Sequence, residues 1–168
     1  MKKNLKCMIA SLCLISKLTP AAVIAIVDSG NDFKHKDLMN KAWINPIEIA
    51  DNDRDEDKNG YQDDINGWNF AEGNNQLIDY SYSYSYNNDT KNFFEIQLKA
   101  FLGTLTEDDR TWYKEKIKDQ SFIKSLQIFG NWMHGTHVTG ISIKGADDAK
   151  AIGIKLIPTE VKIPGKGI

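Results

Sequence analysis

The chain has 168 residues, of which 41% are hydrophobic and 26% are charged, and its formal net charge is −2. This length and composition are typical of one globular domain, which excludes collagen-like and wholly disordered proteins. Lys and Arg are balanced by acidic residues, so the chain lacks the basic field that nucleic-acid binding requires. We therefore expect no nucleic-acid partner.

The N-terminus has the pattern of a secretory signal peptide. Three lysines in MKKNLK precede the apolar run 7–15 (CMIASLCLI), which is too short to span a bilayer. We predict that 1–21 is a signal peptide and that the protein is secreted, periplasmic or attached to the cell surface, with no stable membrane span. Both cysteines, Cys7 and Cys13, lie in this segment, so the mature chain would suit an oxidising compartment. The alternative is a buried N-terminal strand or helix.

A strand is predicted at 21–27 (AAVIAIV), a continuous apolar run rich in β-branched residues. Such a run is typical of a strand buried on both faces of a parallel sheet. It ends at Asp28, which a Ser-Gly turn follows. Residues 31–70 contain several turn signals and are predicted to be mainly loop. The segment 79–86 (DYSYSYSY) could alternate as a strand, but its polar flanks favour a surface loop.

Helical periodicity begins after residue 93. Apolar side chains then recur at spacings of three and four, which predicts an amphipathic helix. These side chains are Phe94, Leu98, Phe101, Leu102 and Leu105. Thr106, followed by three acidic residues, predicts the N-cap of a second helix, and 122–129 predicts a short third one. We expect a helical hairpin packed on the rest of the domain. Short buried strands are predicted at 152–157 and 161–163.

Two short segments carry candidate catalytic chemistry. Asp28 follows the first predicted strand, and sites form beyond the carboxyl ends of strands in open α/β sheets. His134 and His137 belong to HGTHVTG, which is predicted to open a helix. A carboxylate beside an imidazole can accept its Nδ1–H, fix its tautomer and stabilise the imidazolium formed on proton uptake. Alternatively, Asp28 caps a turn and the histidines are satisfied core residues.

The segments VIAIVDSG and HGTHVTG resemble the catalytic Asp and His motifs of the subtilisin-like serine proteases, or subtilases. The resemblance implies that Asp28 orients His134 and that His134 is the general base. It also implies a structural role for His137 and close packing around the helix at Gly135 and Gly140.

The resemblance covers 22–70 and 131–164. It implies an α/β, three-layer subtilisin-like fold with a parallel sheet, incomplete in this chain. We interpret 22–168 as a partial subtilase catalytic domain in which 71–130 form an insertion with helical segments. The implied function is that of a secreted serine endopeptidase that hydrolyses peptide bonds in protein or peptide substrates.

An acidic segment at 53–64 (DRDEDKNGYQDD) places oxygen-bearing side chains at every second position before a glycine turn. Alternating oxygen ligands allow a loop to curl around a hard cation such as Ca²⁺. The match to an EF-hand is incomplete, because no bidentate Glu stands at the twelfth position. We expect a structural Ca²⁺ site, with a solvated acidic loop as the alternative. The predicted ligands are Asp53, Asp55, Asp57, Asn59, Tyr61 and Asp63.

A serine nucleophile is missing from the recognisable motifs. None of the serines stands in the Gly-Thr-Ser motif that carries the nucleophile of subtilases. We therefore expect the isolated chain to be inactive and a missing C-terminal segment to complete the fold. One alternative is a truncated or pseudoprotease module that binds calcium or a partner without catalysis. Another is a membrane-surface protein held by an uncleaved N-terminus, which rests on residues 1–15 alone.

Overall fold

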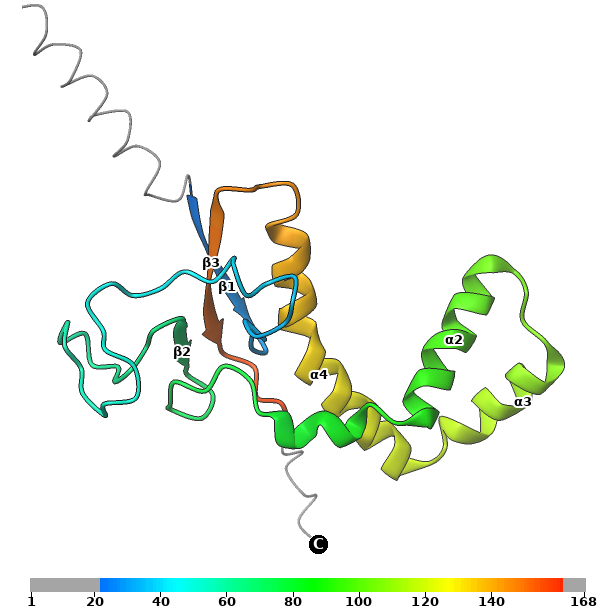
Figure 1. Ribbon diagram of the computed structural model, residues 1–168. Coiled ribbons are helices and arrows are strands. Elements are labelled where there is room, and N and C mark those ends of the chain that lie inside the picture. The colour runs from blue at the N-terminus through cyan, green and yellow to red at the C-terminus, as the bar shows by residue number, and fades with distance from the viewer. Residues whose placement is uncertain (1–21, 162–168) are drawn as a thin grey trace, which may run out of the picture.

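The structure, a computed structural model, describes residues 22–161 (Figure 1). This part of the chain is a mixed α/β protein with a small parallel sheet of three strands and four helices. The elements are β1 (Ala22–Asp28), β2 (Gly67–Asn69), the 3-10 helix η1 (Tyr80–Ser85), α2 (Asn88–Leu102), α3 (Glu107–Lys116), α4 (Gln120–Ser142) and β3 (Ala149–Lys155). The expected α/β class is thus confirmed. The expected signal peptide, and most of the strand expected at 161–163, lie outside the described residues.

The sheet has the strand order β1–β3–β2, and both pairs are parallel. β1 and β3 align along their full length, from Ala22 beside Ala149 to Asp28 beside Lys155. Helix α4 runs along one face of the sheet (Figure 1). The buried core on this face consists of Ile26, Leu38, Ile143 and Ala151. Because the strands are parallel, their carboxyl ends, including Asp28, meet at one edge of the sheet.

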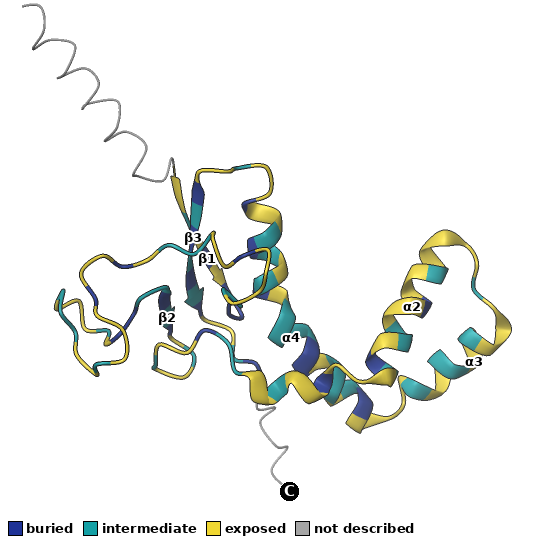
Figure 2. Ribbon diagram, in the orientation of Figure 1, coloured by how far each residue is buried: buried dark blue, intermediate teal, exposed yellow. Residues whose placement is uncertain are grey.

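The prediction that the first strand is buried on both faces is wrong. Ile26, on the face toward α4, is 4% exposed, whereas Val23 and Val27, on the opposite face, are 46% and 55% exposed. Partners in a parallel pair point to the same side, so Ile152 and Ile154 of β3 continue this uncovered face. In the described part of the chain, helix α4 covers one face of the sheet (Figure 2). A wholly apolar run has no alternation of polar and apolar residues, so the sequence does not show that the other face is exposed.

Helix α4 is one continuous helix, although a short helix at 122–129 and a separate one opening near His134 were predicted. The Asp119 side chain caps it by accepting hydrogen bonds from two amides of the first turn. No proline interrupts the helix, and the glycine at 130 costs only about 1 kcal/mol. That cost is too small to break a helix that packs on a sheet. His134 therefore lies in the middle of α4 and not at its start.

Helices α2 and α3 form a hairpin that projects away from the sheet (Figure 1). As predicted, Thr106 caps α3, because its hydroxyl accepts from the amide of Asp109, whose carboxylate accepts from the Thr106 amide. The base of the hairpin packs on α4, where the rings of Phe94 and Phe129 are 5.7 Å apart. Farther along α2, Phe101 is 87% exposed, so the expected packing on the domain is only partly right.

The Tyr/Ser-rich segment forms the 3-10 helix η1, so it is neither the surface loop that was predicted nor the alternative strand. Asp79 begins this helix by accepting a hydrogen bond from the amide of Ser81. The indole of Trp132 in α4 donates to the carbonyl oxygen of Asp79 over 2.9 Å, and the ring of Tyr86 stacks on Phe129. These contacts tie η1 to the first half of α4.

Candidate acid–base site

Asp28 and His134 meet at the carboxyl end of the sheet, although 106 residues separate them in the chain. Asp28 is the last residue of β1, and His134 lies on α4. The Oδ1 atom of Asp28 and the Nδ1 atom of His134 are 2.7 Å apart, which is a hydrogen-bond distance. The Asp28 side chain is 12% exposed, whereas the imidazole is 60% exposed. A buried carboxylate thus supports an imidazole that reaches solvent.

The carboxyl group of Asp28 is held in its ionised form. Burial raises its pKa by removing hydration, but hydrogen bonds from His134 and from the amide and hydroxyl of Ser29 outweigh this effect. Together they hold the pKa of Asp28 below its ordinary value. An ionised carboxylate can only accept, so Nδ1 of His134 carries the hydrogen and Nε2 has a free lone pair when the ring is neutral. That tautomer suits proton uptake on the exposed side of the ring.

The turn after β1 approaches the backbone of α4 closely at Gly135. A Cβ atom at this position would lie 2.1 Å from the carbonyl oxygen of Gly30. The amide of Gly135 donates to Oγ of Ser29 over 3.2 Å, and this hydroxyl donates in turn to Asp28. A Cβ atom at Gly140 would meet no described atom within 4 Å, so the close packing expected there is wrong. Gly135 alone of the two allows the contact that aligns the pair.

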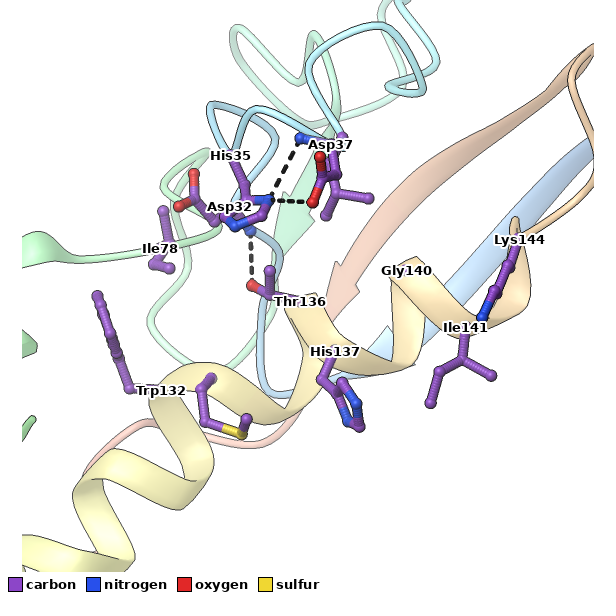
Figure 3. A pocket seen from close by; sticks show the side chains of 12 residues that line it. Asp32, His35, Asp37, Ile78, Trp132, Thr136, His137, Gly140, Ile141 and Lys144 are labelled. Atoms are coloured by element: carbon purple, nitrogen blue, oxygen red, sulfur yellow. Dashed lines mark hydrogen bonds and ion pairs between the residues drawn. The ribbon is translucent and has the colours of Figure 1, made fainter. Parts of the chain in front are cut away.

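His137 lines a cavity between α4 and the segment 32–38 (Figure 3). The cavity has a volume of about 450 Å³, and Trp132 and Ile141 contribute to its mainly apolar lining. On another wall, Nδ1 of His35 is 3.9 Å from a carboxylate oxygen of Asp37. Neither member of the Asp–His pair lines this cavity. The structure therefore separates the second histidine of the HGTHVTG motif from the first.

Three acidic side chains gather in the loop between β1 and β2. Glu48, Asp55 and Asp57 each offer one oxygen atom, and these atoms lie within 4.8 Å of one another. Asp55 and Asp57 were predicted as calcium ligands, whereas Glu48 was missed because it precedes the alternating segment. A signal was present in the sequence, since Glu48 is a lone charge in the otherwise apolar stretch PIEIA.

The other predicted calcium ligands have different partners. Asp63 is buried, and its two carboxylate oxygens accept hydrogen bonds from the amides of Asn52 and Asp53. The side-chain oxygen of Asn59 accepts from the amide of Tyr61 over 2.8 Å. The Nδ2 atom of Asn59 donates to Oδ2 of Asp57 over 3.1 Å, so this side chain lies at the acidic cluster but turns its nitrogen toward it. The carboxylates of Asp53 and Asp63 are not among the clustered oxygens.

Backbone amides hold the cluster in place. The Oε1 atom of Glu48, which is 8% exposed, accepts from the amides of Glu56 and Asp57, and its Oε2 atom accepts from the amide of Asp63. Hydrogen bonds, first of all from the side chain of Asn45, hold the pKa of Asp57 below its ordinary value. Carboxyl oxygens on a loop fixed in this way fit the donor set that a hard cation requires.

Comparison of the chain with known proteins finds no matching family model, no matching curated protein and no matching solved structure. Within residues 22–161, none of the helices combines the length and the apolar character needed to cross a membrane. The geometry of the Asp28–His134 pair is therefore the main basis for assigning a function.

Proposed function

We propose that this chain supplies the Asp and His members of a subtilisin-like serine endopeptidase, with Asp28 as the orienting carboxylate and His134 as the general base. The observation that carries the proposal is the 2.7 Å hydrogen bond between them, formed by the DSG and HGTHVTG segments. Its place at the carboxyl end of a parallel strand supports the proposal. The α/β unit would then be part of a three-layer subtilisin-like domain, with 71–130 as an insertion.

In the proposed reaction the pair moves one proton. Nε2 of His134 takes the proton from a serine hydroxyl as the serine oxygen attacks the scissile carbonyl of a protein or peptide substrate. The ionised Asp28 stabilises the resulting imidazolium through the hydrogen bond to Nδ1. The proton then passes from Nε2 to the leaving amine. A water molecule releases the acyl group by the same two proton transfers.

The serine is proposed to come from polypeptide outside these 168 residues, because no serine here stands in a nucleophile motif. Two uncovered apolar surfaces support a further segment that completes the fold. One is the sheet face with Val23 and Val27, and the other lies on α4 beside the cavity, where Ile141 is 62% exposed. Domains bury such faces against another layer of structure. The isolated chain is therefore expected to have no peptidase activity.

A fluorophosphonate probe, which reacts covalently with activated serines, tests the proposal. We expect the probe to label protein isolated from its native cells through an affinity tag on this chain, and the label to be lost in His134→Ala. His137→Ala is the matched control and should keep the label, because His137 lies outside the pair. Correctly folded native protein without any label would contradict the enzymatic function.

The alternative function is a non-catalytic interaction module, either truncated or a pseudoprotease. The missing nucleophile motif favours it, as does the apolar surface of α2, where Leu98 and Phe101 are 57% and 87% exposed. The same probe separates the two functions, because such a module would remain unlabelled in its native cells.

We also propose that Glu48, Asp55 and Asp57 hold a structural Ca²⁺ ion that stabilises their loop. At a Ca²⁺ concentration 100 times the dissociation constant, binding should raise the free energy of unfolding by about 2.7 kcal/mol. Asp55→Asn should remove most of this gain, because it deletes a charged ligand. Calorimetric titration and thermal unfolding with and without Ca²⁺ measure both effects.

Asp51→Asn is the control for this prediction. Asp51 lies in the same loop with a φ of 59°, a conformation that Asn adopts readily, and it is outside the cluster. Its substitution should leave Ca²⁺ binding nearly unchanged. Absence of any heat or thermal shift at millimolar Ca²⁺ in the wild-type chain would rule out the calcium site.

Export is the remaining part of the proposal. The charged start and apolar run within 1–21 support a signal peptide, and the carboxylate-rich loop suits a compartment in which Ca²⁺ is abundant. N-terminal sequencing of the native protein is expected to begin near the start of β1. Retention of Met1 would contradict cleavage.

A further inference from the structure

Asn31 is a buried polar residue in the turn after β1. It is 2% exposed, and its Nδ2 atom donates to Oγ1 of Thr139 over 2.5 Å and to the carbonyl oxygen of Gly135 over 3.3 Å. Thr139 is fully buried, and its hydroxyl donates to the same carbonyl oxygen over 2.7 Å. Asn31 and Thr139 thus converge on the residue that directly follows His134 in α4.

The side chain of Asn31 lies between α4 and strand β3 of the sheet. A Cβ atom at Gly153 of β3 would lie 2.5 Å from Oδ1 of Asn31, so the amide occupies space that the glycine leaves free. Among the described residues, Oδ1 has no hydrogen-bond partner. An unpaired buried acceptor is unfavourable, and an apolar side chain would avoid that cost. Asn31, unlike an apolar residue, forms hydrogen bonds with α4.

The position of the His134 ring depends on how α4 is attached to β1. The ring is 60% exposed, so side-chain packing does little to hold it. Its place is set by the helix that carries it and by the bond to Asp28. The contacts of Asn31 and Thr139 end on Gly135, the residue next to His134. They therefore hold α4 at one rotation about its axis and one position along it, relative to Asp28. A displacement of about 1 Å in such a pair is enough to impair catalysis.

We propose that Asn31 is a positioning residue of the Asp28–His134 pair, which locks α4 to the turn after β1 through Thr139 and Gly135. This role rests on the proposed function of the pair, because otherwise the contact would only stabilise the fold. Loss of the Asn31–Thr139 hydrogen bond should therefore change the state of the His134 ring as well as the stability of the protein.

¹⁵N NMR of the imidazoles in the purified full chain, at about pH 8, above the ordinary pKa of histidine, reports the tautomer of His134. Thr139→Val deletes the hydroxyl with little change in shape and should lower the ratio of the Nδ1–H to the Nε2–H tautomer by about threefold or more. Asn31→Leu should lower this ratio as well. Thr139→Ser keeps the hydroxyl and should preserve the wild-type ratio.

Thr90→Val is the matched control. Thr90 is also fully buried, and its hydroxyl donates to the carbonyl oxygen of Ser85 over 2.7 Å, away from the pair. It should destabilise the fold and leave the tautomer ratio unchanged. A wild-type ratio in both Thr139→Val and Asn31→Leu would overturn the positioning role alone. A wild-type chain without preference for the Nδ1–H tautomer would overturn the pair itself and the positioning role with it.

Discussion

Replacement of Asp28 by Asn should lower kcat of the proposed peptidase reaction by about 10⁴-fold. The amide has nearly the size of the carboxylate, so β1 and the following turn should keep their geometry. Its NH₂ group, however, can donate to Nδ1 of His134, which favours the Nε2–H tautomer and removes the lone pair that accepts the proton of the serine. The negative charge that stabilises the imidazolium is also lost. The effect should therefore fall on kcat, with little change in KM.

Asp37→Asn is the control for this experiment. Asp37 is an exposed carboxylate 2.9 Å from the ammonium group of Lys36, outside the Asp28–His134 pair. Surface substitutions of this kind change free energies little, so kcat should change by less than about twofold. Hydrolysis of a peptide substrate by native protein that carries each substitution provides the measurement. Wild-type kcat in Asp28→Asn would exclude the orienting role, whatever polypeptide supplies the serine.

Features of the fold that depend on local chemistry were predictable, and those that depend on packing were not. The start of α3 was predicted because a capping box needs only Thr106 and Asp109, three residues apart. The continuity of α4 through residue 130 was not predicted, because it depends on packing against the sheet, which outweighs the poor helix propensity of one glycine. Val23 and Ile26 are equally apolar, so nothing local shows that one is exposed and the other buried.

The same limit applies to the candidate site. A carboxylate after a buried strand and a HGTH segment identified the Asp–His pair, because both motifs are contiguous in the sequence. Glu48 joins the acidic cluster through hydrogen bonds to amides eight to fifteen residues away, which the alternating pattern does not contain. Asn31 and Thr139 are 108 residues apart, and each by itself is an ordinary polar residue. Their meeting depends on how α4 packs on β1.

Gly135→Ala should destabilise the protein, although alanine is the better helix former. The new Cβ atom would lie 2.1 Å from the carbonyl oxygen of Gly30, and a backbone atom cannot move away as a flexible side chain can. We expect this overpacking to cost about 3 kcal/mol. The gain in helix propensity offsets only about 1 kcal/mol, which leaves a net loss of about 2 kcal/mol. Urea unfolding followed by tryptophan fluorescence measures the change.

Gly140→Ala is the comparison variant, and we expect it to stabilise the protein. Gly140 lies in the same helix, but a Cβ atom there would meet no described atom within 4 Å. The gain in helix propensity is then not offset, so the free energy of unfolding should rise by up to about 1 kcal/mol.

The clash at Gly135 also pushes α4 away from the turn next to Asp28. Gly135→Ala should therefore weaken the hydrogen bond between Asp28 and His134, whereas Gly140→Ala should preserve it. Equal effects of the two substitutions on stability would contradict the close approach of turn and helix on which the alignment of the pair depends.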